Sequence, residues 1–371
     1  MNKHILMFTD TWGVGGIEQV ILASSRTVLH AGASVTLYAN SKWSSLADET
    51  LDSMGVKTVY GSDKYDPSLL SRHKRGVSCF TKLLKQEKFD VVHVHAMNGT
   101  GYIYVNLAKR AGVPIRILHS HNTSFGSGHN LLKVWFNFFA RHLYQDCPTV
   151  RIACSNDAGR YLFGNKNFSI LNNCVDVERF RFSENVRAET RNEFNISPDK
   201  KVVGVIGRIT DQKNPKKVLA VFKTMHDINE NIILMMIGDG DLSEEVSSIV
   251  NAYGLNGCVV RIPATNNPER YYSCFDLYLF PSKFEGLGIA AIEAQCSGLP
   301  VLMSDSLPEE VRATDLAVPM SLNRNDEEWA LQGLKMLDST NDRKHYSECS
   351  SLHEFSFTVF SRSLKSFYWQ S

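Results

Sequence analysis

The chain has 371 residues, which is enough for two domains of ordinary size. Its 40 Lys and Arg residues balance its 39 Asp and Glu residues, which argues against a general attraction to nucleic acid. No run reaches the ~18 apolar residues that cross a bilayer, and Asp10 follows the short apolar start at once. We therefore expect a first strand near residues 3–9 rather than a signal peptide.

Eight cysteines are scattered along the chain, and no two of them form a CxxC pair. A zinc site needs clustered ligands, so this spacing argues against one. Reduced thiols in a cytoplasmic protein are the simpler interpretation.

The first half of the chain alternates short apolar runs with amphipathic stretches. Such alternation predicts a parallel sheet that is covered by helices on both faces. The helical stretches include residues 17–29 and 102–111. The predicted strands cover residues 4–9, 34–38, 56–60, 91–95, 115–119, 151–153 and 168–171.

A glycine-rich turn, Gly13-Val14-Gly15-Gly16, separates the first predicted strand from the first helix. A helix start at this place in a doubly wound sheet can bind a phosphate or a sugar, which makes Gly15 and Gly16 candidate substrate contacts. A tight structural turn explains the same glycines. The turn lacks a full GxGxxG pattern and the second strand ends at Asn40 rather than at an acid. A dinucleotide-dependent dehydrogenase is therefore the weaker interpretation.

Two histidine pairs end two of the predicted strands: His93 with His95, and His119 with His121. Strand alternation places each pair on one side of its strand. Four histidines suggest a metal site, but no carboxylate ligand accompanies them. We therefore expect no metal here and interpret the histidines as polar residues at the edge of a cleft.

Two segments of the first half are candidates for contact with a membrane surface. Residues 71–88 surround Phe80, Leu83 and Leu84 with basic side chains, and residues 131–144 have the aromatic-rich sequence LLKVWFNFFARHLY. A basic amphipathic helix can lie on an anionic surface. The alternatives are a solvated helix face for the first segment and a core helix for the second.

The second half begins after residues 177–198, whose polar composition predicts a connection between domains. An apolar strand over residues 201–206 is followed by Arg208, and residues 211–215 open a helix with Pro215 in its first turn. Arg208 and Lys213 therefore bracket a turn at a strand end. A guanidinium at such a place can bind two phosphate oxygens and an ammonium supplies a mobile positive charge, although two solvated bases would show the same pattern.

Further strands are predicted over residues 232–237 and 259–262. Asp239-Gly240-Asp241 follows the first of them and resembles a metal-binding DxD pair. Acids here can also cap the helix predicted over residues 242–250, so we expect no metal site. The pattern becomes helical again from residue 321 to residue 352, and residues 355–369 form a last amphipathic helix.

Residues 276–303 predict a strand, a glycine-bearing loop, a helix and a second strand. Glu285 lies in the loop, and Glu293 lies two turns along the helix, ~10 Å away at the helical rise. Backbone N–H groups at a helix start bind anions, and acids beside them suit sugar hydroxyls. An activated sugar carries such hydroxyls on both sides of a diphosphate. A structural turn with exposed acids is the alternative.

The sequence Phe284-Glu285-Gly286-Leu287-Gly288 together with Glu293 resembles the EX7E motif of glycosyltransferase family 4. Members of that family are retaining, nucleotide-sugar-dependent enzymes with the GT-B fold. Gly207–Lys213 is similar to the family's G-R-x-x-x-x-K diphosphate site, and residues 172–176 are similar to its NGVD segment, with Cys174 in place of glycine. The resemblance extends over nearly the whole chain and points to bacterial exopolysaccharide, capsule and O-antigen transferases.

The resemblance implies an α/β protein of the GT-B class, in which two doubly wound parallel-sheet domains face one another across a cleft. Residues 1–180 would form the N-terminal, acceptor-side domain. Residues 181–354 would form the C-terminal, nucleotide-sugar-binding domain. Residues 355–371 would form a helix that crosses back to the first domain.

The resemblance also implies roles for the site residues. Arg208 and Lys213 would neutralise the leaving diphosphate, and Glu285 would hold donor sugar hydroxyls. His121 would contact the transferred hexose, with His119 ranked second. The expected substrate-binding residues are Gly15 and Gly16 at the diphosphate and acceptor, Ile262 at uracil, the amides of Gly286, Leu287, Gly288 and Ile289 at the helix start, and Glu293 at the ribose.

The expected reaction is transfer of a hexose from a nucleotide sugar, most simply a UDP-sugar, to a growing saccharide carried on a polyprenyl diphosphate. The family's mechanism retains the anomeric configuration and uses no protein nucleophile. We expect no cofactor, no divalent metal and no nucleic-acid partner, and a cytoplasmic location at the inner face of the plasma membrane with an anionic surface as partner. The rivals are an epimerase or phosphorylase of the same fold and a nucleotide-sugar-binding protein without catalysis.

Overall fold

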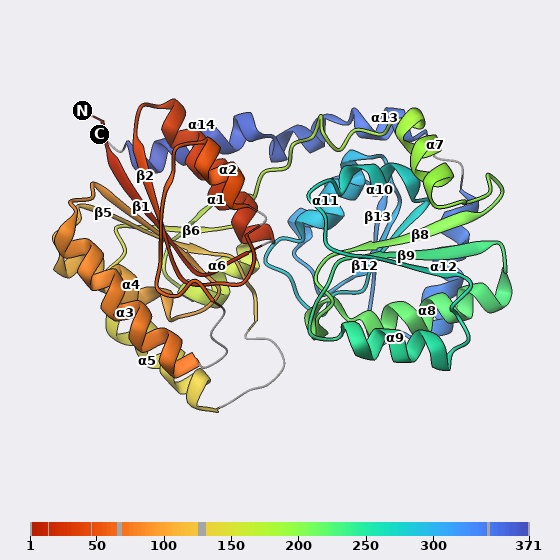
Figure 1. Ribbon diagram of the computed structural model, residues 1–371, viewed down its shortest axis with the longest axis horizontal. Coiled ribbons are helices and arrows are strands. Elements are labelled where there is room, and N and C mark those ends of the chain that lie inside the picture. Colours follow the sequence, from red (N-terminus) through yellow and green to blue (C-terminus); the bar gives the residue numbers. More distant parts are fainter. Residues whose placement is uncertain are drawn as a thin grey trace. The chain divides into compact units, whose positions relative to one another are not determined.

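The computed structural model describes residues 2–13, 15–45, 47–64, 69–124, 131–339 and 342–369 (Figure 1). It consists of two compact units, Met1–Cys174 with Phe357–Ser371, and Val175–Ser356. The chain thus passes from the first unit to the second between Cys174 and Val175, where the sequence analysis placed the change after residue 180. The terminal segment from Phe357 belongs to the first unit.

The first unit contains a seven-stranded parallel sheet with the order β3-β2-β1-β4-β5-β6-β7. Its central strands are largely buried and mostly apolar, as expected where helices cover both faces of a parallel sheet. The strands are β1 (His4–Trp12), β2 (Ser34–Lys42), β3 (Lys57–Tyr60), β4 (Val91–Ala96), β5 (Ile115–Ser120), β6 (Val150–Ala153) and β7 (Ser169–Ile170).

Helices lie on both faces of this sheet (Figure 1). The last helix of the chain packs beside the first, because Phe360, Leu364 and Tyr368 recur at helical spacing and enter the same core as Val20 and Ile21. The helices are α1 (Gly16–His30), α2 (Asp48–Ser53), α3 (Leu69–Gln86), α4 (Gly101–Arg110), α5 (Leu131–Tyr144), α6 (Asn156–Phe163) and α14 (Phe357–Tyr368).

The second unit contains a six-stranded parallel sheet with the order β10-β9-β8-β11-β12-β13. Its core joins residues of the four central strands with helices on either side, including the fully buried Phe222 and Trp329. The strands are β8 (Lys201–Ile206), β9 (Ile232–Ile237), β10 (Val259–Ile262), β11 (Leu277–Phe280), β12 (Val301–Ser304) and β13 (Ala317–Met320). The helices are α7 (Glu184–Glu193), α8 (Pro215–Ile228), α9 (Ser243–Ala252), α10 (Glu269–Cys274), α11 (Ile289–Cys296), α12 (Asp326–Asp338) and α13 (Arg343–Ser347), with 3-10 turns at Asp211–Lys213, Glu309–Val311 and Ser350–Phe355.

The prediction of a polar connection over residues 177–198 is wrong. Those residues contain α7, which packs against α10 in the second unit. Arg187 and Arg191 of α7 each form an ion pair with Asp276 at 2.6 Å, and all three side chains are largely buried. The predicted helical run from residue 321 to residue 352 is in fact interrupted, and it holds α12, α13 and part of a 3-10 turn.

Each sheet has one point at which the strand order reverses, between β1 and β4 in the first unit and between β8 and β11 in the second. Ligands of open parallel sheets bind at the carboxyl ends of the strands at such points. All eight cysteines are free thiols, as the sequence analysis expected. Within the residues that the structure describes, no helix combines the length and the apolar character that crossing a bilayer requires.

Candidate active site

The centre of the candidate site in the second unit is an ion pair between Lys213 and Glu285. The Lys213 ammonium donates to Oε1 of Glu285 at 2.7 Å, and it lies 4.7 Å from the centre of the Phe280 ring. Gln212 donates to the second carboxylate oxygen of Glu285 at 3.3 Å and to the carbonyl of Phe284 at 3.0 Å. The loops after β8 and β11, far apart in sequence, are thus held together at the switch point of the sheet.

Arg208 follows β8 at the same edge of the sheet. Its side chain is exposed, and it has no hydrogen bond or ion pair with any residue that the structure describes. Together with Lys213 it lines a small hollow between the ends of β8, β9 and β11. Arg208 is therefore a free positive charge beside a lysine that is already paired.

Backbone geometry at this edge requires glycine. Gly207 and Gly238 have φ values of +148° and +130°, which side chains rarely tolerate. A Cβ atom on Gly238 would lie 2.1 Å from the carbonyl oxygen of Gly207, so no side chain fits there. The close approach of these two strand ends fixes the direction in which the chain leaves β8 toward Arg208.

Helix α11 begins at the same loop. Gly288 precedes it with φ +92°, a conformation that favours glycine, and no side chain of the described residues caps the helix start. Ile289 is the first helical residue, so the amides of residues 286–289 lie at the positive end of the helix dipole. The start of α11, the Arg208 guanidinium and the Lys213–Glu285 ion pair therefore lie at the same edge of the sheet.

Glu293 lies along α11 and ends against buried aromatic side chains. The Tyr272 hydroxyl donates to Oε2 of Glu293 at 2.8 Å, and the Tyr278 hydroxyl donates to the Ile206 carbonyl at 2.9 Å. Both tyrosines are fully buried. Burial raises the pKa of Glu293 to about 7, while the hydrogen bond from Tyr272 and the charges of Arg179 and Lys213 act in the opposite direction. Glu293 is therefore a carboxyl group that changes charge near neutral pH.

The end of β10 lies two strands away from β8 in the same sheet. Ile262 is its last residue, and it is partly exposed. The neighbouring Arg261 has two buried guanidinium nitrogens, Nε and Nη1, without a hydrogen-bond partner among the described residues. The Arg261 side chain is therefore a hydrogen-bond donor beside the position that the resemblance assigns to uracil.

The DxD-like pair after β9 is not a helix cap. Asp239 accepts a hydrogen bond from the Ala264 amide at 2.8 Å, and α9 has no side-chain cap. The expectation that these acids cap the helix is therefore wrong, because Asp239 joins the loops after β9 and β10 instead.

In the first unit, the glycine-rich turn lies between β1 and α1. Gly15 is the residue before the helix and Gly16 is its first residue. A Cβ atom on Gly13 would lie 2.0 Å from the Trp43 ring, which is closer than any side chain allows. The turn is therefore packed against its own unit as well as being placed at the carboxyl end of β1.

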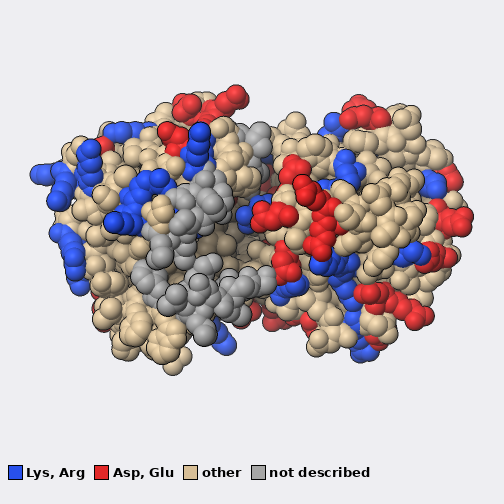
Figure 2. Space-filling model, turned by 60° about the horizontal axis from the view of Figure 1, so that its bottom comes forward, with Lys and Arg blue, Asp and Glu red and all other residues tan. Residues whose placement is uncertain are grey.

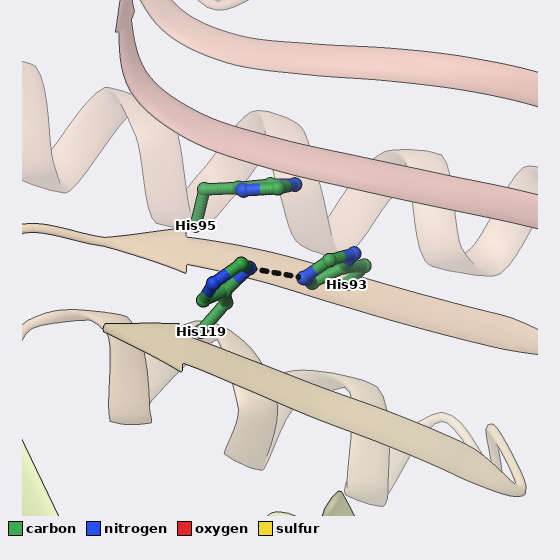
Figure 3. A group of neighbouring side chains, drawn as sticks. All are labelled: His93, His95 and His119. Atoms are coloured by element: carbon green, nitrogen blue, oxygen red, sulfur yellow. Dashed lines mark hydrogen bonds between the residues drawn. The ribbon is translucent and has the colours of Figure 1, made fainter. Parts of the chain in front are cut away.

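The four histidines form one buried array at the ends of β4 and β5. His93 Nε2 and His119 Nδ1 are 3.2 Å apart, and His95 Nδ1 and His121 Nε2 are 2.9 Å apart. The His93 and His95 rings stack at 4.0 Å between centres. Figure 3 shows three of these rings, with a hydrogen bond between His93 and His119.

Burial makes these histidines neutral. It lowers the pKa of His93 and of His121 to about 3, and those of His95 and His119 lie well below the ordinary value for the same reason. Among the described residues, the group whose ligand atoms lie close enough for a metal consists of His93, His95 and His119 alone. His93 already uses both ring nitrogens in hydrogen bonds, which leaves it no lone pair for a metal. The array therefore fits hydrogen bonding better than metal binding.

The structure brings together Arg208, Lys213, Glu285 and the start of α11, with Glu293 farther along the helix. It places Gly15, Gly16 and His121 in the first unit. Sequence reasoning missed Gln212, Tyr272 and Tyr278 at the site of the second unit. Their partners are far away in the chain, so no local spacing could reveal them.

Comparison with known proteins identifies the two units. The family model described as Glycosyltransferase Family 4 matches residues 14–179, and the model described as Glycosyl transferases group 1 matches residues 186–349. A protein of Bacillus subtilis (strain 168) that is named as a glycosyltransferase, EpsF, is 28% identical over 337 residues, which cover 89% of this chain and 86% of the relative.

A second relative is the Escherichia coli enzyme named UDP-Gal:alpha-D-GlcNAc-diphosphoundecaprenol alpha-1,3-galactosyltransferase. It is 26% identical over 251 residues, which cover 64% of this chain and 63% of that protein. Among solved structures, Anabaena HepE in complex with UDP and glucose has a TM-score of 0.80 at 12% identity, with 98% of both chains covered.

WaaG, a glycosyltransferase involved in lipopolysaccharide biosynthesis, has a TM-score of 0.78 at 13% identity, with 99% of this chain and 100% of that chain covered. At such identities the structural likeness concerns the fold. The two family models together cover most of the chain. The chain therefore belongs to the glycosyltransferases of the GT-B fold, with a family 4 domain followed by a group 1 domain.

Proposed function

We propose that the protein transfers a hexose from a UDP-sugar to a growing, lipid-linked saccharide of the cell surface, with retention at the anomeric carbon. The observation that carries this proposal is Arg208, which has no partner among the described residues, beside the Lys213–Glu285 pair and the start of α11. These groups provide two positive charges and a helix dipole for a diphosphate, and a carboxylate for sugar hydroxyls.

The Lys213–Glu285 pair suits a site that waits for its substrate. Each charge compensates the other while the site holds no donor, which limits the cost of keeping two largely buried charges. When the donor binds, its diphosphate offers Lys213 a new anionic partner, and its sugar offers Glu285 hydroxyl donors. As the bond to the leaving diphosphate breaks, negative charge grows beside Lys213 and Arg208, which stabilises the transition state.

Three similar proteins support the choice of donor and acceptor. HepE is described in complex with UDP and glucose and also with UDP-glucose. The Escherichia coli relative is named for a UDP-galactose donor and a diphosphoundecaprenol acceptor, and a Staphylococcus aureus relative for capsular polysaccharide biosynthesis. We propose the same classes here: UDP-linked hexose as donor and a polyprenyl-diphosphate-linked saccharide as acceptor.

The test is a thermal-shift panel of nucleotide sugars, followed by assay of UDP release with candidate acceptors. A ligand that binds the folded state raises its stability by RT ln(1 + [L]/Kd), so the true donor is expected to stand out from the panel. A protein that binds UDP-sugars without catalysis would show the shift and release no UDP with any acceptor. Equal shifts for all nucleotides, or none, would overturn the proposal.

Release of UDP is expected to continue after exhaustive chelation of divalent metals. The charge of the diphosphate already has protein partners in Arg208 and Lys213, and Asp239 is used in a contact with Ala264. Asp239→Asn and Asp241→Asn are expected to retain turnover within a fewfold of wild type. Loss of activity in chelator, with recovery in magnesium and loss in both variants, would contradict this prediction.

We further propose that the first unit rests on an anionic membrane. The balanced charge of the whole chain hides a strong asymmetry. The first unit holds 21 Lys and Arg against 11 Asp and Glu, a net charge of +10, and the second holds 19 against 28, a net charge of −9. On the face seen in Figure 2, blue basic side chains predominate over the first unit, whereas both signs mix over the second.

Helix α5 supplies an apolar contact for such a surface. Trp135, Phe138, Phe139 and Leu143 are between 51% and 67% exposed and form one aromatic-rich face, so α5 is not the core helix that the alternative required. Helix α4 packs between α5 and α3, and Lys82 and Lys85 of α3 are exposed. Amphipathic helices that combine such features bind anionic lipid surfaces.

The protein is expected to pellet with anionic vesicles at low salt, to be released by salt and not to bind neutral vesicles. Changing Phe138 and Phe139 together to serine removes apolar contact area and should weaken binding about tenfold or more. Leu331→Ser is the matched control, because Leu331 is similarly exposed, at 53%, but lies in the second unit. Equal binding by the double serine variant and by Leu331→Ser, or no binding of wild type at low salt, would argue against membrane binding by the first unit.

A further inference from the structure

Tyr368, near the end of the chain, contacts the histidine array. Its hydroxyl lies 2.6 Å from Nδ1 of His93, and both residues are fully buried. The residue is fixed from two sides, because Phe360 and Leu364 anchor α14 in the core and the Lys3 ammonium donates to the Tyr368 carbonyl at 2.5 Å. The last helix therefore delivers one hydroxyl group to one imidazole nitrogen.

The hydrogen bonds that start at Tyr368 can run in two directions. If the hydroxyl donates to Nδ1 of His93, then His93 carries its proton on Nε2 and donates it to Nδ1 of His119. His119 then carries its proton on Nε2. In the opposite direction, His119 donates to His93, His93 donates to Tyr368, and the phenolic hydrogen has no acceptor among the described residues.

The two directions differ in the number of buried polar groups that they leave without a hydrogen-bond partner. Nε2 of His119 is buried and has no partner among the residues that the structure describes. The first direction leaves a single orphan, the N–H of His119. The second leaves two orphans, the phenolic O–H and the bare Nε2. Because each buried unpaired polar group is costly, the first direction is favoured.

The second histidine pair lacks such a fixed end. His95 Nδ1 and His121 Nε2 share one hydrogen bond, and the remaining nitrogens, Nε2 of His95 and Nδ1 of His121, are both buried without a partner among the described residues. Either direction leaves one N–H and one lone pair, so this pair can adapt to a donor or an acceptor. Only the pair that Tyr368 contacts, His93 and His119, has a defined direction of hydrogen bonding.

We propose that Tyr368 and His93 are positioning residues, which hold His119 as its Nε2–H tautomer so that it donates a hydrogen bond to an oxygen of the sugar substrate. The proposal rests on the proposed function for the substrate, but the tautomer can be measured without any substrate. A neutral donor of fixed direction suits a hydroxyl or ring oxygen, which is uncharged. It also gives α14, far from β5 in sequence, a role in the site.

The test combines nitrogen-15 spectra of the histidine rings with steady-state kinetics on Tyr368→Phe. The spectra distinguish Nδ1–H from Nε2–H tautomers. Wild-type His119 is expected as Nε2–H alone, and Tyr368→Phe is expected to give a mixture of tautomers with kcat lowered about tenfold, the worth of one hydrogen bond. Tyr102→Phe is the matched control, since Tyr102 is equally buried in the same unit and its hydroxyl contacts the Leu162 carbonyl.

Conservative replacements of His119 give an independent measure. Glutamine places an amide N–H near the position of Nε2, whereas asparagine places one near Nδ1. His119→Gln is therefore expected to retain more turnover than His119→Asn. Equal losses would argue against a donor at Nε2.

An Nδ1–H tautomer in the wild type, or unchanged spectra and turnover in Tyr368→Phe, would overturn the proposal. A merely structural role would lower the thermal midpoint in Tyr368→Phe and Tyr102→Phe alike and leave the His119 tautomer unchanged. If the wild type releases no UDP from any UDP-sugar, the proposed function fails. The spectra of wild type and Tyr368→Phe still decide whether Tyr368 sets the tautomer of His119. Spectra with and without added UDP-sugar decide whether His119 contacts the sugar.

Discussion

Alanine in place of Arg208 or Lys213 is expected to lower turnover about a hundredfold, which corresponds to ~3 kcal/mol of lost transition-state stabilisation. Each variant removes one positive charge from the edge of the sheet where the leaving diphosphate gains negative charge. Arg208 has no partner among the described residues, so its loss should leave stability unchanged. Lys213→Ala also leaves the largely buried Glu285 without its ion partner, which should lower the thermal midpoint.

Lys283→Ala is the control for a general effect of charge. Lys283 lies on the loop after β11 and forms a 2.5 Å ion pair with Asp211, but both side chains are more than 40% exposed. Exposed pairs contribute little, so turnover should fall by less than about threefold. Lys213→Ala combined with Glu285→Gln should recover stability without recovering turnover. UDP release at the wild-type rate in both Arg208→Ala and Lys213→Ala would refute the diphosphate assignment.

The places of the candidate site residues at strand ends follow from local patterns. Arg208 and Lys213 follow a buried strand directly, and Glu285 lies in the loop of a strand–loop–helix unit, so periodicity alone places each at a strand end. Strand β13 was missed because it is short, partly exposed and contains Pro319, features that edge strands tolerate and that hide their pattern.

Helix α7 was missed for a different reason. Its contacts with the second unit are largely polar, with Arg187 and Arg191 on Asp276, so it lacks the apolar stripe by which helices are recognised. Tyr272 and Tyr368 were missed because each meets a partner that only the folded chain brings near. The charge asymmetry was missed because the opposite charges of the two units cancel in the total.

Changing Glu293 to glutamine is expected to stabilise the protein at alkaline pH and to weaken UDP binding at the same time. Burial raises the pKa of Glu293 from its ordinary 4.5 to about 7, so the folded state holds the proton more tightly than the unfolded state does. The resulting stabilisation is fully present below pH 4.5 and is lost as the pH rises through 7. Above pH 7 the wild type keeps a partly buried charge that the unfolded chain would keep in water.

Glutamine has the same shape, can accept the hydrogen bond from Tyr272 and carries no charge at any pH. The free energy of unfolding of Glu293→Gln should therefore exceed that of wild type only slightly near pH 4.5. The difference should grow to as much as about 3 kcal/mol at pH 8, by 1.36 kcal/mol per pKa unit. Denaturant unfolding at several pH values measures this difference. UDP affinity at pH 8 should fall, because a carboxylate accepts hydrogen bonds from ribose hydroxyls more strongly than an amide does.

Higher stability at alkaline pH together with weaker UDP binding in Glu293→Gln distinguishes a binding residue from a structural one. Replacing a residue that is retained for stability would destabilise the protein. Replacing a partly buried acid that is retained for its ligand relieves the cost of its desolvation. Glu230→Gln is the control, because Glu230 is an exposed carboxylate of the same unit and its replacement should change stability little. Stability of Glu293→Gln that falls below wild type at pH 8, or UDP affinity equal to wild type, would contradict the proposed contact between Glu293 and the ribose.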